Sequence, residues 1–300
     1  MLISSSTLSA FLLGIVLYAM PNSSQAVDRA PSNLANSVRD DSNTLILAKN
    51  HREKRKMGGK KKMGKRAAKA PYEYFEAKGL FATGLVPVFP EGLDCPPISS
   101  PYGSQTRYDG SQRNNSHHDY HNGMDISLEP GTPLLAVADG TVVHKGTAGQ
   151  LVGNYVWLHL APQSTQLSIH IFARYQHLDE PSPLNVGDLV KAGDIVGSGG
   201  ATGTTGGHFG SSGYSHLHLI FSTGPSADHQ VSPDKPLIKH ATQNYLDPLG
   251  LYLDKSMGAV TNHALRDLSS DQKKVSVPVR TTDGRTVPKG ANLVWPLACQ

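Results

Sequence analysis

Two short motifs rich in histidine and carboxylate could bind a metal ion. The first is His121-Asn-Gly-Met-Asp125 and the second is His216-Leu-His218. Side chains two residues apart on a β-strand project from the same face, so His216 and His218 are expected side by side, one as a metal ligand and the other as its catalytic neighbour. Imidazole and carboxylate groups are zinc ligands, and three protein ligands leave a fourth position for water, as in catalytic zinc sites.

The first motif requires a bend in the chain. In an extended strand the Cα atoms of His121 and Asp125 would lie about 13 Å apart, which is too far for both to bind one ion easily. Gly123 lies between them and permits a turn or a bulge. The sequence therefore predicts a kink at Gly123 that brings the imidazole and the carboxylate together.

A third histidine lies between the two motifs. His177 is near the end of the expected strand Ser168–Leu178, where alternation places Ala173, Tyr175 and His177 on one face. Each motif alone occurs often by chance, and paired histidines on a strand are more often ordinary surface or core residues. Both motifs and a third histidine in one strand-rich region favour a metal site. A four-ligand structural zinc is a poor alternative, because the chain has only 2 Cys.

Short apolar runs separated by turns follow one another from Ser100 to about Leu253. The chain holds 30 Gly and 20 Pro, which interrupt helices, and its 38% hydrophobic residues suffice for one core of moderate size. The stretches Gly131–Val142 and Gly187–Gly197 resemble each other, each with two short apolar strands and a turn. We therefore predict a mostly β fold of short sheets packed face to face. The expected strands are Leu134–Val137, Thr141–His144, Tyr155–Leu160, Ser168–Leu178, Ile195–Val196 and Leu217–Phe221.

These motifs resemble the lysostaphin and LytM-type zinc endopeptidases of bacterial cell walls. The resemblance covers Pro101 to Leu253 and includes the stretches GTPLLAVADGTVV, GNYVWLHL, RYQHL, GDLVKAGDIVGSGGATG and DPLGLYL in the family's order. It implies an antiparallel β-sandwich with one zinc ion, Zn2+. By this resemblance the zinc ligands are His121, Asp125 and His218, and the two catalytic histidines are His177 and His216.

The resemblance also implies a reaction, the hydrolysis of peptide bonds in the stem or cross-bridge peptides of peptidoglycan. A metal-activated water would attack, assisted by the two catalytic histidines. The chain departs from the family near the site: Ala173 stands where Thr is common, Leu219 and Ile220 replace Phe and Glu, and the link from Gly203 to Ser215 is longer. Substrate specificity is therefore not carried over. Two alternatives remain, a catalytically silent scaffold that activates a cell-wall amidase and an exported protease acting on Gly-rich proteins.

The amino terminus has the layout of a cleavable signal peptide. An apolar stretch from Leu8 to Met20 is followed by Pro21 and by small residues that end at Ala26. We expect residues 1–26 to be removed and the protein to be periplasmic or secreted.

A basic segment follows the expected signal peptide. Residues 49–69 hold eleven Lys or Arg and one acid, which leaves 17 basic and 23 acidic residues elsewhere, so the net charge of +4 comes from this segment. Because apolar residues are few, 27–71 is expected to be a flexible arm. In an exported protein it would meet an anionic wall polymer or a membrane surface, and no nucleic acid is expected as a partner. A solvated linker without a partner is the alternative.

Two further segments flank the expected zinc endopeptidase domain, 101–253. Residues 72–100 form a Pro-rich lead-in that carries Cys95. Residues 254–300 form a C-terminal extension with a hairpin signal, Thr282–Arg285, and Cys299 near the end. Two cysteines at the borders of the folded region of an exported protein predict a disulfide between Cys95 and Cys299.

Overall fold

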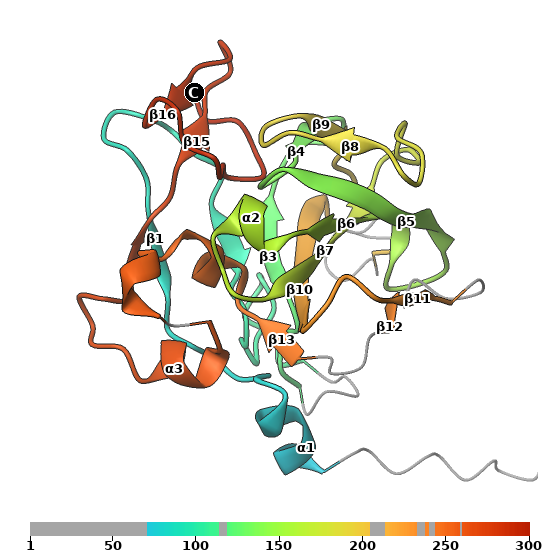
Figure 1. Ribbon diagram of the computed structural model, residues 1–300. Helices are drawn as coiled ribbons and strands as arrows, with labels where there is room; N and C mark the ends of the chain where they lie inside the picture. Colours follow the sequence, from blue (N-terminus) through green and yellow to red (C-terminus); the bar gives the residue numbers. More distant parts are fainter. Residues whose placement is uncertain (1–70, 114–118, 205–213, 233–237, 240–243, 259) are drawn as a thin grey trace, which may run out of the picture. The chain divides into compact units, whose positions relative to one another are not determined.

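A computed structural model describes residues 71–113, 119–204, 214–232, 238–239, 244–258 and 260–300 of the chain (Figure 1). The signal peptide and the basic arm expected from the sequence lie outside the described residues, except for Pro71. Within the described part of the chain, no helix has the length and apolar character needed to cross a membrane.

The described residues are built around one antiparallel sheet of eight strands. Seven strands follow one another in the order β2, β3, β10, β7, β6, β5, β8, and β13 also pairs with β10 (Figure 1). Every strand pair in this sheet is antiparallel, which confirms the mostly β, antiparallel prediction. The strands are β2 (Ile98–Ser100), β3 (Met124–Ser127), β5 (Gly140–Ala148), β6 (Gly153–Leu160), β7 (His170–Leu178), β8 (Leu189–Val190), β10 (His216–Gly224) and β13 (Asn244–Leu246).

Alternation along the strands divides this sheet into a core face and a site face. In β10, Leu217, Leu219 and Phe221 are buried in the main hydrophobic core. His216 and His218 therefore project from the opposite face, which we call the site face. Burial of each large apolar side chain stabilises the fold by about 1.5–3 kcal/mol. A register slip of one residue would exchange leucines and histidines between the faces, so core packing fixes the orientation of the histidines.

A small second sheet packs on the same core. It consists of β4 (Pro133–Leu135) and β9 (Ile195–Ser198), which pair in antiparallel fashion. Leu134 and Val196 of these strands belong to the main hydrophobic core. The two strands come from the two stretches of similar sequence described above, so the repeated pattern reflects two segments that pair with each other.

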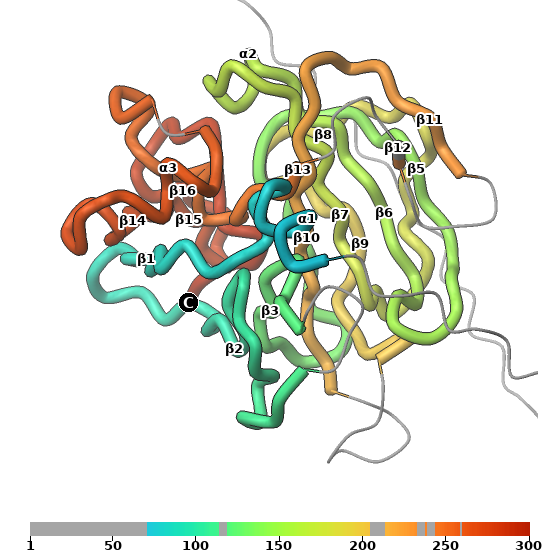
Figure 2. Tube along the Cα trace, turned by 90° about the horizontal axis from the view of Figure 1, so that it is seen from below, coloured from blue at the N-terminus to red at the C-terminus, as the bar shows by residue number. Residues whose placement is uncertain are grey.

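The lead-in and the C-terminal extension are joined to each other. Strand β1 (Val86–Val88) of the lead-in pairs in parallel with β14 (Lys274–Ser276) of the extension (Figure 2). Cys95 and Cys299 form a disulfide, with their Cα atoms 4.4 Å apart. Asp94 and Gln300, the neighbours of the two cysteines, exchange two backbone hydrogen bonds. The end of the chain is thus fastened to the lead-in.

Helices are few and short. The turn expected at Thr282–Arg285 joins β15 to β16, and a single helical turn, α2, lies within the connection from β6 to β7. The remaining elements are α1 (Tyr72–Ala77), α2 (Pro162–Thr165), α3 (Asn262–Arg266), the 3-10 helices η2 (Pro248–Tyr252) and η3 (Lys255–Met257), and the short strands β11 (Gln230–Val231), β12 (Ile238–Lys239), β15 (Val279–Arg280) and β16 (Thr286–Val287).

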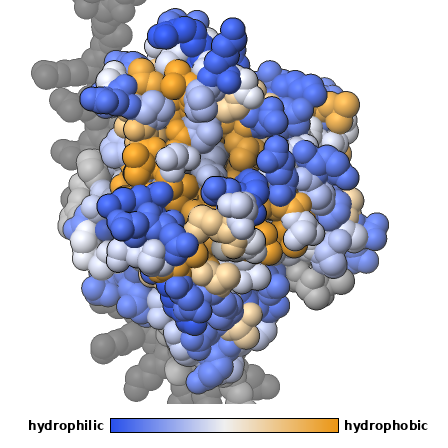
Figure 3. Space-filling model, turned by 60° about the vertical axis from the view of Figure 1, so that its left-hand side comes forward, coloured by the Kyte–Doolittle hydropathy of each residue, from blue (hydrophilic) through white to orange (hydrophobic). Residues whose placement is uncertain are grey.

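A cavity of about 400 Å³ lies between the lead-in and the sheet. Most of its lining is apolar, and its polar members include Thr83 and Asp247. Figure 3 brings the side of β1 forward and shows apolar side chains, in orange, grouped between polar ones. In β1 itself, Val86 and Val88 are 54% and 44% exposed.

Candidate metal centre

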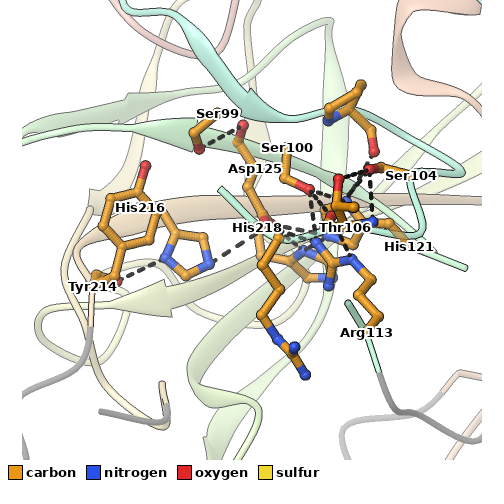
Figure 4. Close-up of polar contacts among 12 residues, drawn as sticks. Ser99, Ser100, Ser104, Thr106, Arg113, His121, Asp125, Tyr214, His216 and His218 are labelled. Carbon is orange, nitrogen blue, oxygen red and sulfur yellow. Dashed lines mark hydrogen bonds and ion pairs between the residues drawn. The ribbon is translucent and has the colours of Figure 1, made fainter. Parts of the chain in front are cut away.

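His121, Asp125 and His218 form a compact group of potential metal ligands (Figure 4). Asp125 on β3 pairs directly with His218 on β10, so the two side chains are cross-strand neighbours on the site face. The Asp125 Oδ1 atom lies 2.7 Å from His218 Nδ1 and 3.1 Å from His121 Nε2. The two imidazole nitrogens are 3.1 Å apart.

A bend in the chain brings His121 to this group. The chain bends at Asn122 and Gly123, immediately before β3 begins. A Cβ atom at Gly123 would lie 2.6 Å from the carbonyl oxygen of Leu219 and 2.8 Å from the ring of His218. Glycine is therefore required here by the close approach of β10, and the kink expected from the sequence is present.

Two polar contacts of Nδ1, one to the backbone and one to a side chain, orient the His121 ring. Its Nδ1 atom lies 3.1 Å from the carbonyl oxygen of Pro101 and 3.4 Å from the hydroxyl of Ser100. Nδ1 thus faces the carbonyl oxygen of Pro101, and Nε2 faces Asp125. His121 is only 2% exposed, so packing restricts the orientation of its ring.

The geometry and chemistry of this group fit a divalent metal ion. Ligand atoms bonded to one tetrahedral ion at about 2.0–2.1 Å would be separated by roughly 3.3 Å, and the observed separations are 2.7 to 3.1 Å. Two imidazoles and one carboxylate suit zinc and several other transition metals. The site therefore supports the binding of a divalent metal ion.

The protonation states match those of metal ligands. Burial would raise the pKa of Asp125, but the adjacent His121 and His216 and hydrogen bonds from His121 and His218 hold it well below its usual value. Burial lowers the pKa of His218 to about 3. The carboxylate is consequently ionised and the His218 imidazole neutral at neutral pH, as coordination requires.

His177 reaches the same site through a β-bulge. In the β6–β7 pairing, Asn154 faces Leu178 and Tyr155 faces Gln176, which leaves His177 as the extra residue. Its φ of +62° lies in the left-handed region. The expectation that His177 shares the face of Ala173 and Tyr175 is therefore wrong, because alternation stops at this residue.

The bulge turns the His177 ring toward the other histidines. The ring centroid lies 4.7 Å from that of His216 and 6.0 Å from that of His218. The Nδ1 atom lies 2.8 Å from the carbonyl oxygen of Thr202. Burial, together with the repulsion that a proton on this ring would meet from a protonated His216 or His218, lowers the pKa of His177 to about 3, so its ring is neutral.

His216 is held by aromatic stacking. Its ring stacks on Tyr214 with centroids 4.9 Å apart, and Tyr214 stacks on Tyr108 at 3.9 Å. The His216 Nδ1 atom lies 2.7 Å from the carbonyl oxygen of Tyr214, and its Nε2 atom is 3.6 Å from Asp125 Oδ1. The structure thus brings together all five residues that the sequence singled out.

Sequence reasoning missed two residues that border this site, Arg113 and Tyr108. Arg113 contacts Asp125, and Tyr108 carries the aromatic stack beside His216. Both belong to a polar loop without hydrophobic periodicity. The available signals in the sequence were the charge of Arg113 and the aromatic ring of Tyr108. Such residues are common in loops and do not by themselves indicate a site.

The segment that contains this site matches known peptidases. Residues 119–230 match the model of Peptidase family M23. The glycyl-glycine endopeptidase ALE-1 of Staphylococcus capitis is 32% identical over 124 residues, which is 40% of this chain and 30% of that protein. Lysostaphin of Staphylococcus simulans is 30% identical over 124 residues, 40% of this chain and 22% of its own length. The chain thus spans about a third or less of the length of these two relatives.

The solved catalytic domain of lysostaphin from Staphylococcus simulans is 25% identical and covers 51% of this chain and 87% of that domain, with a TM-score of 0.33. The matched segment contains Asp125 and His218 on paired strands and His121 before them. Residues 119–230 therefore belong to peptidase family M23, and this segment is similar to the lysostaphin and LytM-type members of that family.

Proposed function

We propose that this protein is an exported zinc metalloendopeptidase that hydrolyses peptide bonds in bacterial peptidoglycan. The observation that carries the proposal is the joint placement of three candidate metal ligands and two further histidines at one site beside the sheet. The relatives named lysostaphin and glycyl-glycine endopeptidase support a peptidase that acts on short wall peptides. The expected signal peptide supports export, and the disulfide is consistent with an oxidising compartment.

The ligands and the two other histidines have separate tasks. His121, Asp125 and His218 would hold the ion, which would acidify a water molecule and polarise the scissile carbonyl group. His177 and His216 each direct Nδ1 to a backbone carbonyl, of Thr202 and Tyr214 respectively. Each ring therefore leaves its Nε2 to accept a proton or, once protonated, to donate to an oxyanion.

Peptidoglycan and its alternatives can be separated by a digestion experiment. The purified protein is measured for zinc content and then incubated with isolated cell walls, with soluble pentaglycine and with a Gly-rich protein, with and without chelator. We expect chelator-sensitive release of wall peptides, restored by added zinc. Cleavage of the Gly-rich protein alone would favour the extracellular protease. Full zinc occupancy without any hydrolysis, together with activation of a wall amidase, would favour the scaffold.

A further inference from the structure

A short hairpin carries an arginine into the metal centre. Residues 105–113 fold back on themselves, with a bridge between Thr106 and Gln112 and backbone hydrogen bonds that include Arg113 N–H to the Gln105 carbonyl. The hairpin consists mostly of polar residues and contributes none to the main hydrophobic core. Its last described residue, Arg113, nevertheless has a side chain only 13% exposed, because the guanidinium lies against Asp125.

Three hydrogen bonds fix this guanidinium (Figure 4). Arg113 Nη2 donates to the Ser100 hydroxyl at 2.7 Å and to Asp125 Oδ2 at 3.4 Å. Arg113 Nε donates to the carbonyl oxygen of Thr106 at 3.1 Å. The Ser100 hydroxyl also lies 3.4 Å from His121 Nδ1. One side chain thus contacts one candidate ligand directly and a second through Ser100.

The two oxygens of Asp125 have different neighbours as a result. Oδ1 faces the imidazole nitrogens of His121 and His218, at 3.1 and 2.7 Å. Oδ2 faces Arg113. The hydrogen bond from the guanidinium therefore restrains Oδ2 on the side away from the two imidazoles. This arrangement favours coordination of an ion through Oδ1 alone.

We propose that Arg113 is a positioning residue of the metal centre, which holds Asp125 in a one-oxygen orientation and restrains His121 through Ser100. The proposal rests on the proposed metal-dependent function and adds a residue to it. Partners that orient metal ligands commonly change metal affinity by 10- to 100-fold when they are removed. A positive charge beside a dication would by itself weaken binding, so geometry and charge make opposite predictions for Arg113.

Lysine is the informative replacement because it separates these two effects. Arg113→Lys keeps the charge, but a single ammonium cannot reproduce the planar arrangement that reaches Thr106, Ser100 and Asp125 together. Arg113→Gln removes the charge as well. Arg107→Lys is the matched control, because Arg107 lies on the same hairpin and its guanidinium bonds to Ser111 and Gln112.

The experiment measures the dissociation constant of Zn2+ by competition with a chromophoric chelator, and the visible absorption of bound Co2+ as a report on coordination geometry. We expect both Arg113 variants to bind Zn2+ 10- to 100-fold more weakly than the wild type and to show an altered Co2+ spectrum. Arg107→Lys should stay within about twofold of the wild type. Thermal melting in excess chelator checks that each apo variant is folded.

The outcomes separate this inference from the proposed function. Wild-type affinity and spectrum in Arg113→Lys, or tighter binding by Arg113→Gln, would overturn the positioning role and leave the metallopeptidase intact. A wild-type protein that binds no metal would refute the proposed function itself. If the Arg113 variants do not fold, Ser100→Ala tests the same contacts. Zinc binding several-fold weaker than in the wild type would support the link from Arg113 through Ser100 to His121, and unchanged binding would reject it.

Discussion

The imidazole rings of His177 and His216 lie 4.7 Å apart on the site face, although strict alternation would place His177 on the core face. The β-bulge at His177 produces this relationship, and its left-handed backbone costs on the order of 1–3 kcal/mol in a residue other than glycine. The neighbouring pairs, Leu178 with Asn154 and Gln176 with Tyr155, hold the strand in register on both sides. Strain placed beside a reactive group is a common feature of active sites.

We predict that His177→Ala and His216→Ala retain zinc and lose most activity. Neither ring belongs to the group of three candidate ligands, but each lies beside it. Removal of a general acid or base typically costs 10²- to 10⁴-fold in rate. The measurement is the rate of wall-peptide release alongside zinc content, with His263→Ala as control, because His263 lies on α3, outside the site. Wall hydrolysis at the wild-type rate in either variant would refute this division of tasks.

We predict that Ala at His121, Asp125 or His218 abolishes metal binding. Among the described residues, each of these three supplies one close ligand atom, so the remaining two would bind weakly. Elemental analysis should find zinc well below one equivalent in each variant. A full equivalent of zinc in Asp125→Ala would show that the ion lies elsewhere.

The sequence predicted which residues lie together better than it predicted their local geometry. His216 and His218 follow the period of two in a strand whose leucines are buried, so their common orientation could be read directly. His177 sits in an equally apolar strand, but the bulge depends on the pairing of β7 with β6 and Val152, which no local pattern encodes. Alternation therefore predicted the wrong face for it.

Arg113 and Tyr108 were not predicted from the sequence for a related reason. Arg113 and Tyr108 reach the site because the hairpin at 105–113 folds back beside β2 and meets Tyr214, more than 100 residues later. Contacts of this kind arise from tertiary packing. The sequence contains the residue types but no periodicity that would bring them to Asp125 or His216.

We predict that loss of the Cys95–Cys299 disulfide lowers stability without removing zinc. The bond closes a loop with a sequence separation of 204 residues, which in the chain-entropy model stabilises the fold by about 5 kcal/mol. The cysteines belong to the lead-in and the extension, whereas Asp125 and His218 are on β3 and β10. Thermal melting of Cys95→Ser/Cys299→Ser should shift to lower temperature, with zinc content unchanged. Zinc loss in the folded variant would mean that the extension supports the metal centre.

We predict that deletion of residues 49–69 weakens binding to anionic walls or membranes in a salt-dependent manner. The segment carries eleven basic residues, whose attraction to a negative surface is screened by salt. Sedimentation with cell walls at low and high salt measures the effect, and turnover of a small soluble peptide should be unchanged. Equal loss of binding and turnover would indicate that the segment is needed for folding.

We predict that ionisation of Asp247 lowers the free energy of unfolding as the pH rises from about 4 to about 6. Burial raises the pKa of this carboxyl from 3.8 to about 6, and hydrogen bonds from Thr83 and the Leu249 amide only partly offset the shift. The folded state therefore binds the proton more tightly than the unfolded state. The contribution of Asp247 to the free energy of unfolding is complete below its pKa in the unfolded state. It is lost as the pH rises through its pKa in the folded state, by roughly 3 kcal/mol in total.

The substitution Asp247→Asn isolates this contribution, because the amide is similar in shape and does not titrate. Urea unfolding of the oxidised, metal-free wild type and variant is compared at several pH values between 4 and 7. We expect the wild type to lose stability relative to the variant across this interval, because only the wild type must bury an ionised carboxylate beside the apolar cavity. A stability difference between the two proteins that stays constant with pH would show that Asp247 titrates alike in the folded and unfolded states.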